Sequence, residues 1–320
     1  MKNKNGVMSV NAIIEKITEQ IQEGIYPGAS LALYRKGQWS EHYLGLADPE
    51  KGESVVADLV YDLASVSKVV GVATICAFLY AKGELSLDRP FKELYPRFAH
   101  EKTTIRELLT HTSGLDPFIP NRDQLDARQL KTALENLQLK EDKSFHYTDV
   151  NFLLLGFWLE DRFHQPLDRL FEELIFTPWK MTETRFGPVE KAVPTVRGLA
   201  SGSVHDPKAR VLGCHAGSAG LFSTVADLER FLEHYLKDDF ARDLSQNFAR
   251  EEGKTRALGW NLEGDWLDHT GYTGTFIMYN RKRQEAVIFL SNRTYEKDER
   301  AQWILDRNSL MDLIKQEFEK

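Results

Sequence analysis

The stretch that decides the fold covers residues 61–81 and reads YDLASVSKVVGVATICAFLYA. A strand-like YDLA segment passes into Ser65-Val66-Ser67-Lys68, and a mostly apolar run follows directly. We expect a helix from Ser65 to about Lys82. The apolar run is only about thirteen residues long, whereas a membrane span needs about 20, so the pattern indicates a helix buried in a protein core.

Strand patterns at both ends of the chain predict one antiparallel sheet. Residues 29–47 read as two strands joined at a Lys-Gly turn. Amphipathic helices are predicted near the N-terminus, from isoleucines spaced by three or four, and from about Asp298 to Phe318. The sequence therefore predicts an α+β fold with a central antiparallel sheet, flanked by N- and C-terminal helices, plus a helical lobe. Further strands are expected at 256–262, 276–282 and 285–292, and further helices at 105–111, 149–163, 166–175 and 224–237.

One domain with two lobes accounts for this order of elements. We expect residues 1–320 to form a single domain, with an α/β lobe of about 1–64 and 216–320 and a mainly helical lobe of about 65–215. Neither an internal repeat nor a low-complexity linker interrupts the chain, so the lobes should share an interface. A cleft between them is the natural place for a functional site.

The composition is that of an ordinary globular protein and argues against several classes. The chain is 42% hydrophobic, and 48 acidic against 41 basic side chains give a formal net charge of −7. The basic residues are scattered, so nucleic acid is not expected as a partner. The N-terminus shows an amphipathic pattern rather than a signal peptide, so we expect no membrane association and a cytoplasmic location. With only Cys76 and Cys214, no disulfide framework is indicated.

Ser65 and Lys68 have the chemistry of an activated serine nucleophile. Three residues apart at the start of a helix, they lie on one face within reach of each other. A free hydroxyl is a weak nucleophile until a neighbouring base takes its proton, and a lysine can orient or deprotonate it. The free N–H groups at the helix start would stabilise an oxyanion beside Ser65. Alone the pattern is weak, because an N-cap serine followed by a surface lysine has the same spacing.

The sequence motifs that accompany Ser65 and Lys68 are more specific than the pair itself. The segment YDLASVSK, followed by LLTHTSGL at 108–115, resembles the serine β-lactamase and penicillin-binding protein superfamily, specifically its class C-like branch. Tyr147-Thr148-Asp149 stands where that family has Tyr-x-Asn, and His269-Thr270-Gly271 where it has Lys-Thr-Gly. The glycine-rich segment 203–224 is similar to that of esterase-like members. The resemblance extends from about Pro27 to Asn292 and implies a β-lactamase/transpeptidase-like fold.

The resemblance also implies roles for individual residues. Ser65 would attack a carbonyl carbon, Lys68 would help to remove its proton, and Tyr147 would pass a proton to the leaving group. The amides of Ser65 and Tyr272 would form the oxyanion hole. All these groups come from the protein, so no metal and no organic cofactor is expected. The remaining candidates, as substrate-binding residues, are Asp149, His269, Thr270 and Gly271.

Two positions depart from the β-lactamase pattern and bear on the substrate. His269 replaces a charged lysine with a mostly neutral group, which weakens attraction for a substrate carboxylate. Asp149 replaces an amide with a carboxylate, which near Lys68 would raise the pKa of the lysine and shift proton transfer toward Tyr147. Both changes look like those of esterase and D-amino-acid peptidase relatives, so a neutral or amine-bearing substrate is expected, with weak or no β-lactamase activity.

Several residues outside these motifs have alternative interpretations. His205, Asp206, Cys214 and His215 lie within eleven residues of one another and are zinc-binding types, but their spacing matches no standard zinc pattern. We interpret the first two as fixing the glycine-rich loop. His111 in THTSGL is interpreted as a structural or supporting residue.

The predicted function is that of a serine hydrolase, which acylates Ser65 and then hydrolyses the acyl-enzyme. Its expected substrates are small-molecule esters or D-amino-acid amides or peptides. One alternative is a D-alanyl carboxypeptidase or penicillin-binding protein. An alternative of another class is a penicillin-binding sensor or scaffold without turnover. The sequence indicates neither the acyl group nor an oligomeric state.

Overall fold

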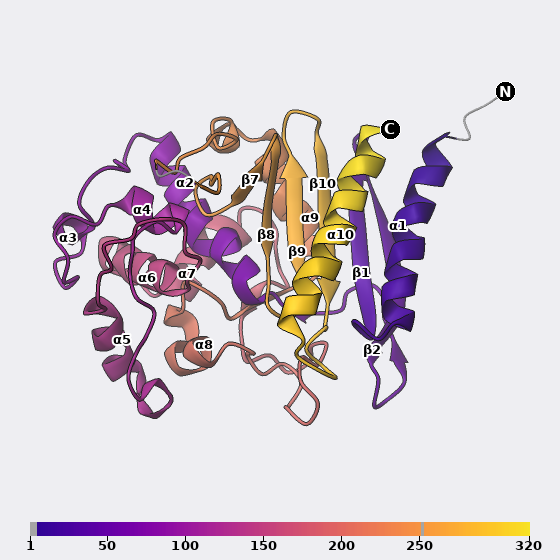
Figure 1. Cartoon of the computed structure of the whole chain (residues 1–320), viewed down its shortest axis with the longest axis horizontal. Coiled ribbons are helices and arrows are strands. Elements are labelled where there is room, and N and C mark those ends of the chain that lie inside the picture. The colour runs from indigo at the N-terminus through magenta and orange to yellow at the C-terminus, as the bar shows by residue number, and fades with distance from the viewer. Residues whose placement is uncertain (1–4, 251–252) are drawn as a thin grey trace.

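A seven-stranded antiparallel sheet forms the centre of the protein, with helices on both of its faces (Figure 1). The computed structural model describes residues 5–250 and 253–320. The strand order is β3-β2-β1-β10-β9-β8-β7, so N-terminal and C-terminal strands meet where β1 pairs with β10. The α+β fold with a central antiparallel sheet is confirmed.

The sheet strands are β1 (Gly28–Arg35), β2 (Gln38–Asp48), β3 (Glu53–Ser54), β7 (Asn261–Glu263), β8 (Trp266–Thr270), β9 (Phe276–Asn280) and β10 (Glu285–Ser291). A second, three-stranded sheet contains β4 (Tyr61–Asp62), β5 (Arg185–Phe186) and β6 (Leu221–Ser223). The α-helices are α1 (Asn5–Gln22), α2 (Thr74–Ala81), α3 (Phe91–Leu94), α4 (Ile105–Thr110), α5 (Ala127–Glu135), α6 (Val150–Phe163), α7 (Leu167–Phe171), α8 (Pro207–Leu212), α9 (Val225–Lys237) and α10 (Arg300–Glu319).

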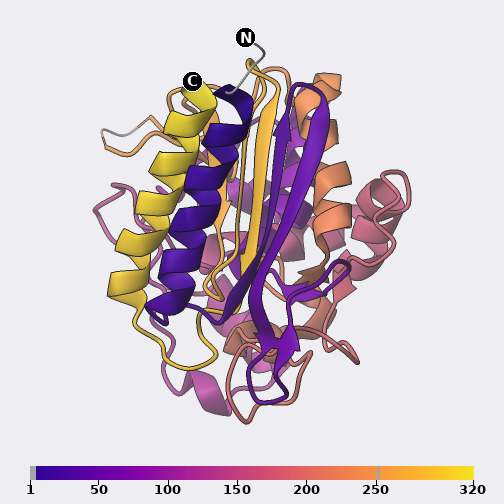
Figure 2. The same ribbon diagram turned by 90° about the vertical axis from the view of Figure 1, so that its right-hand side faces the viewer.

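Both faces of the central strands are covered. Helices α1 and α10 lie side by side on one face, and α9 covers the other (Figure 2). In β1 every residue except the last is therefore buried, and its sequence is mostly apolar rather than alternating. Ile13 and Ile17 of α1 pack into one core cluster with Leu31 and Phe289. Each such side chain contributes roughly 1.5–3 kcal/mol by leaving water.

The predicted hairpin at 29–47 is confirmed, and its turn explains the tight connection. Lys36 and Gly37 have φ angles of 53° and 80°, the left-handed pair that matches the twist of two antiparallel strands. The predicted strand at 256–262 is wrong for its first part, because Gly259 has a φ of 84° and only Asn261–Glu263 pairs with β8. Helices α5 and α8 and the small sheet were not predicted. They are short, and α5 was missed although it is amphipathic, with Leu130 and Leu134 buried on one face.

The helix that carries Ser65 is less regular than predicted. It begins with a 3-10 turn at Ala64–Val66, passes through a π-helical turn at Val69–Ala73 and only then becomes α2. By length and composition alone, Ala64–Ala81 could cross a membrane, but 78% of it is buried inside the protein. The segment is the core helix that the apolar run predicts.

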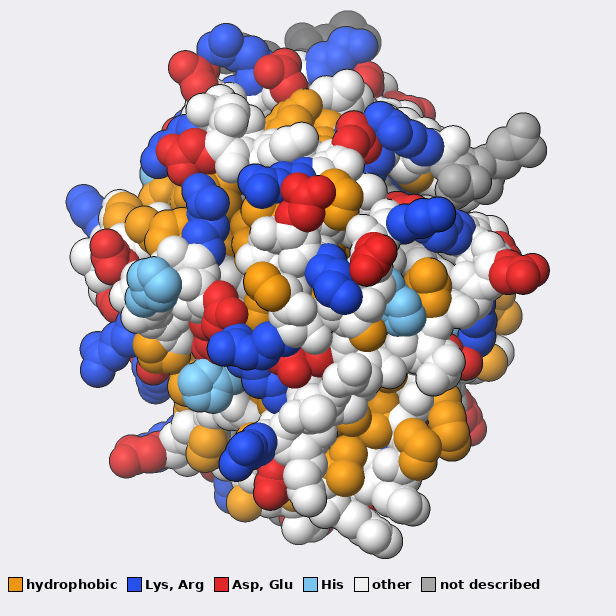
Figure 3. Space-filling model, turned by 90° about the vertical axis from the view of Figure 1, so that its left-hand side faces the viewer, with side chains coloured by type: hydrophobic (Ala, Val, Ile, Leu, Met, Phe, Trp, Pro, Cys, Tyr) orange, Lys and Arg blue, Asp and Glu red, His pale blue; other side chains and the backbone are white. Residues whose placement is uncertain are grey.

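The remaining helices begin largely where the sequence predicts. Helix α4 starts with a capping box between Thr104 and Glu107, and α9 starts with Thr224 accepting from the Asp227 N–H group. The predicted helix at 166–175 is α7 followed by a π-helical turn. Most helices between β4 and β6 gather at one end of the sheet (Figure 1). On that face of the molecule, acidic and basic side chains are interspersed (Figure 3). The exact lobe limits stay a prediction.

Gly71 offers a test of how tightly the nucleophile helix is packed. A Cβ atom at this position would lie 2.4 Å from the ring of Phe171, which is itself buried. We expect Gly71→Ala to lower the free energy of unfolding by about 1–3 kcal/mol, measured by urea denaturation, because the ring cannot move without overpacking its neighbours. Adding Phe171→Leu should restore part of the loss; a strictly additive double variant would contradict this packing.

Candidate active site

Ser65 lies in a strained turn at the start of the core helix. The preceding residue, Ala64, has a φ of 46°, which an L-residue adopts at a cost of about 1–3 kcal/mol. The buried Asp62 carboxylate stabilises the turn, because it accepts hydrogen bonds from the N–H groups of Ala64 at 2.8 Å and His205 at 2.7 Å. Burial raises the pKa of Asp62 to about 6. The turn leaves Ser65 half-buried, in the wall of a cavity.

Lys68 is completely buried, and its ammonium group is fully hydrogen-bonded. Nζ donates to Ser65 Oγ at 2.9 Å, to Asp149 Oδ1 at 2.8 Å and to the Ser218 carbonyl oxygen at 2.9 Å. Burial alone would lower the pKa of Lys68, but the attraction of Asp149 outweighs it and raises this pKa above its ordinary value. Lys68 is therefore held as a cation directly against the Ser65 hydroxyl.

Asp149 lies directly before α6 and faces two lysines. Its Oδ1 atom pairs with Lys68, and its Oδ2 atom lies 3.1 Å from Lys208 Nζ. Burial alone would raise the pKa of Asp149, but the two ammonium groups lower it below the usual range of a carboxyl. The sequence analysis predicted that Asp149 would raise the pKa of Lys68 if the two side chains lay close together. The structure places them in direct contact.

Tyr147 lies close to Lys68 and is supported from behind by His111. The Lys68 ammonium lies 5.2 Å from the centroid of the Tyr147 ring, and the His111 ring lies 4.7 Å from it. His111 Nδ1 accepts from the Thr148 N–H group, and burial lowers the pKa of His111 well below its ordinary value. The Tyr147 hydroxyl is buried without a hydrogen-bond partner among the described residues.

Strand β8 carries His269 and Thr270 along the cleft, and Gly271 follows it. A Cβ atom on Gly271 would lie 2.0 Å from Thr275 Oγ1 and 2.6 Å from the Leu63 carbonyl oxygen. The sequence analysis named Gly271 as a candidate substrate-binding residue. In the structure its closest neighbours are the nucleophile turn and Thr275, so it lets β8 approach Ser65.

Two threonine hydroxyls fix the distance between this strand and the nucleophile. Thr273 Oγ1 donates to the Asp62 carbonyl oxygen at 2.9 Å, and Thr275 Oγ1 donates to the Leu63 carbonyl oxygen at 3.0 Å. Both hydroxyls are buried, where an unmet bond costs about 1–3 kcal/mol. The turn after β8 and the turn before Ser65 are thus held as one unit.

Tyr272 is held by a buried arginine that sequence reasoning missed. Arg293 Nε donates to the Tyr272 carbonyl oxygen at 2.8 Å, and its guanidinium lies 4.6 Å from the Tyr272 ring centroid. Asp298 bonds to both side chains. Tyr272 lines the cavity with Ser65, so the two predicted oxyanion residues come together.

His269 is surrounded by positive charge. Burial, Lys68 and Arg256 lower the pKa of His269 well below its ordinary value, so the imidazole is neutral. Arg256 is also buried, and burial lowers its pKa to about 10. The sequence analysis predicted a neutral histidine but not its neighbour Arg256, which comes from a segment with no recognisable motif.

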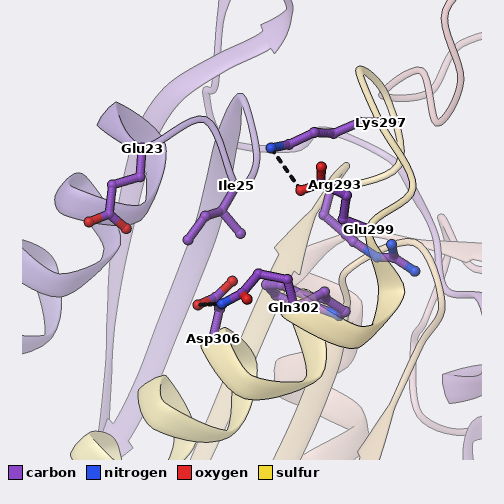
Figure 4. A pocket seen from close by; sticks show the side chains of 8 residues that line it. Glu23, Ile25, Arg293, Lys297, Glu299, Gln302 and Asp306 are labelled. Carbon is purple, nitrogen blue, oxygen red and sulfur yellow. Dashed lines mark hydrogen bonds and ion pairs between the residues drawn. The ribbon is translucent and has the colours of Figure 1, made fainter.

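Two connected hollows meet at Ser65. One, of about 510 Å³, is lined by Tyr147, Asp149 and residues 205–208. The other, of about 210 Å³, has His269, Thr270 and Gly271 on one side. Ser65, Tyr147 and Tyr272 line both, which places the nucleophile between two substrate compartments. A separate pocket of about 190 Å³ lies between the end of α1 and the start of α10, where Lys297 pairs with Glu299 (Figure 4).

The zinc-type residues do not converge. His205 and Asp206 lie at the cavity wall, whereas His215 forms a hydrogen bond with Glu160. Among the described residues no group of three or more His, Cys, Asp or Glu side chains has an arrangement that could hold a metal ion.

The fold and these contacts define a class: a serine hydrolase, with its nucleophile on a buried helix and a lysine bonded to it. The Beta-lactamase family model matches residues 13–310. The chain belongs to the beta-lactamase family, as the resemblance predicted.

Curated relatives and solved structures agree with this assignment. A "Putative D-alanyl-D-alanine carboxypeptidase" of Escherichia coli (strain K12) is 27% identical over 90% of this chain and 83% of that protein. One of Salmonella typhi is 25% identical over 87% of this chain and 81% of that protein.

Two solved structures share the fold. A beta-lactamase/D-alanine carboxypeptidase from Pseudomonas syringae has a TM-score of 0.78 at 21% identity, covering 97% of this chain and 99% of that one. A class C beta-lactamase from Rhodobacter sphaeroides has a TM-score of 0.71 at 20% identity, covering 94% and 99%.

Gly271 offers a test of the close approach between β8 and the nucleophile turn. We expect Gly271→Ala to lower kcat/KM for a p-nitrophenyl ester by about 100-fold, because a shift of about 1 Å in a catalytic element costs this much. Gly264→Ala is a control for backbone strain alone, since its φ is 59° and a Cβ atom there meets nothing within 4 Å. Near-normal activity of the Gly271 variant would contradict a role for this contact.

Proposed function

We propose that the protein cleaves ester bonds or the amide bonds of D-amino-acid peptides by acylating Ser65. The hydrogen bond from the buried Lys68 ammonium to Ser65 Oγ carries this proposal. Such a contact at the wall of a cavity supports a nucleophile and has no evident structural purpose. The names of the curated relatives favour a peptide ending in D-alanine.

The hydrogen bonds indicate how the proton moves. Lys68 uses all three N–H donors and, as an ammonium, has no lone pair to accept the Ser65 proton. In this state Lys68 stabilises the developing alkoxide, and the proton passes to the phenolate oxygen of Tyr147, whose negative charge the Lys68 ammonium also stabilises. Tyr147 then donates a proton to the leaving amine or alkoxide, and water hydrolyses the acyl-enzyme.

The oxyanion of the tetrahedral intermediate would lie between Ser65 and Tyr272. Ser65 is the second residue of its 3-10 turn, where backbone N–H groups have no acceptor within the helix. The Arg293 contacts would keep Tyr272 in place while charge develops on the oxygen.

The cations around the smaller hollow favour a substrate with an acidic end. Lys254, Arg300 and Arg307 line it, and within residues 5–250 and 253–320 none of them has an ion pair with a carboxylate. Burial and the neighbouring arginines lower the pKa of both Lys254 and Arg307, and a bound anion would relieve this repulsion. These residues offset the charge that is missing at His269, and they favour a free carboxylate over the neutral or amine-bearing substrate expected from sequence.

Removal of the nucleophile tests the mechanism directly. Ser65→Ala should abolish turnover of a short-chain p-nitrophenyl ester while the protein stays folded, with a melting temperature only a few degrees lower because Lys68 loses one acceptor. Tyr147→Phe should lower kcat by about 100-fold or more. The exposed Ser40 and the distant Tyr43 provide controls as Ser40→Ala and Tyr43→Phe. Hydrolysis retained by purified Ser65→Ala would overturn the proposal.

The cationic hollow makes a separate prediction about specificity. Lys254→Met and Arg307→Met should each raise KM for a D-alanyl-D-alanine peptide by about 10-fold, since one charge-assisted contact is worth about 1.5 kcal/mol. Turnover of a neutral ester should change little, and Arg242→Met serves as a charge control. The preference for an acidic substrate end is wrong if the wild type does not release D-alanine from such a peptide. It is also wrong if the two substitutions impair cleavage of the peptide and of the neutral ester equally.

A further inference from the structure

Lys208 lies at the active site although no motif marks it. It is the second residue of α8, whose first turn is capped by Asp206. The Lys208 side chain is only 14% exposed, and its Nζ atom lies 3.1 Å from Asp149 Oδ2. It also lines the larger hollow beside Ser65. A long lysine side chain held this far from solvent needs a reason beyond solubility.

The Asp149 carboxylate is divided between two ammonium groups. Oδ1 faces Lys68 at 2.8 Å and Oδ2 faces Lys208 at 3.1 Å. Asp206 lies 4.0 Å from Lys208, so it competes only weakly for the same cation. One carboxylate thus forms ion pairs with two lysines, and only Lys68 is hydrogen-bonded to Ser65.

We propose that Lys208 is a positioning residue that acts through Asp149 to set how strongly Lys68 holds its proton. This inference rests on the proposed function of Ser65 and Lys68. Sharing the carboxylate weakens its attraction for Lys68, and the positive charge of Lys208 adds a like-charge repulsion. Without Lys208, the whole carboxylate would face Lys68 and would offset more of its positive charge, so Lys68 would stabilise the developing alkoxide less well.

The other titratable groups around Lys68, Asp149 and Lys208 do not obscure the pH dependence of acylation. His111 and His269 face Lys68 from the end of α4 and from β8, and burial, with the nearby cations, lowers the pKa of each well below the ordinary value. Both are therefore neutral at neutral and alkaline pH. The other facing groups are Tyr147, Asp206 and Arg256. A rate that rises with pH in the neutral to alkaline range then reports the interacting groups around Lys68 as a whole, not one residue.

The test is the pH dependence of the acylation step in the full-length protein. With p-nitrophenyl acetate, Ser65 Oγ forms a bond to the acetyl carbon, p-nitrophenolate leaves, and the Ser65 proton passes to Tyr147 and then to solvent. The burst of p-nitrophenolate gives the rate, and intact-protein mass spectrometry confirms the acetyl group. In a plot of the acylation rate against pH, we expect Lys208→Met to move the rising limb by about 0.5–1 pH unit to higher pH. At a given pH on that limb, the rate falls about 3- to 10-fold.

Three matched variants separate this role from general effects of charge or stability. Lys208→Arg keeps the charge and should restore the wild-type limb. Arg210→Met removes one positive charge from the same helix, and this exposed side chain should leave the limb nearly unchanged. In an Asp149→Asn background, Lys208→Met should shift the limb by less than half as much, because the shared carboxylate is absent.

Each outcome decides between the two proposals. If wild-type Ser65 is not acetylated, the proposed function fails and this inference fails with it. If it is acetylated but Lys208→Met leaves the limb in place or moves it to lower pH, only the role of Lys208 is overturned. An equal shift in the Asp149→Asn background would also overturn it, since the effect would then not pass through the carboxylate.

Discussion

The Lys68 ammonium has no exposure to solvent, so its charge and its N–H donors need partners within the protein. Leaving such a charge unpaired would cost several kcal/mol. The three groups that meet the demand come from different parts of the chain: Ser65 from the same helix, Asp149 from the start of α6, and Ser218 from the loop before β6. These three segments are therefore joined at Lys68, and moving any of them would leave one buried N–H donor without an acceptor.

The same site shows how position is transmitted from the sheet to the reacting atoms. Strand β8 is fixed by its register with β9, where His269 pairs with Ile277. The hydroxyls of Thr273 and Thr275 then tie the turn after β8 to the backbone before Ser65. Because Ala64 is already strained, this turn has little freedom to adjust. The position of the turn after β8 relative to Ser65 is thus set by the sheet.

The sequence predicts those parts of this arrangement that depend on local pattern. The isoleucine spacing predicts α1, the Lys-Gly pair predicts the first hairpin, and the apolar run predicts the core helix. Motif order brings together Ser65, Lys68, Tyr147 and Asp149. What it does not predict depends on contacts between distant segments. Lys208, Arg293 and Arg256 have ordinary neighbours in sequence, and each acquires its role only where α8, β10 or the segment before β7 packs against the site. The π-helical turn after Lys68 likewise reflects tertiary packing rather than propensity.

The charges around the smaller hollow illustrate why the residue type at one position, such as His269, is a poor guide to substrate specificity. Taken alone, His269 removes a positive charge from the cleft. In the folded protein that histidine is neutral partly because Lys68 and Arg256 repel a proton from it, and Lys254 and Arg307 border the same hollow. A lysine at position 269 would have to share this space with those cations, at a cost that rises as water is excluded. The potential of the hollow is therefore a property of the whole group, so the residue at position 269 and its neighbours constrain one another.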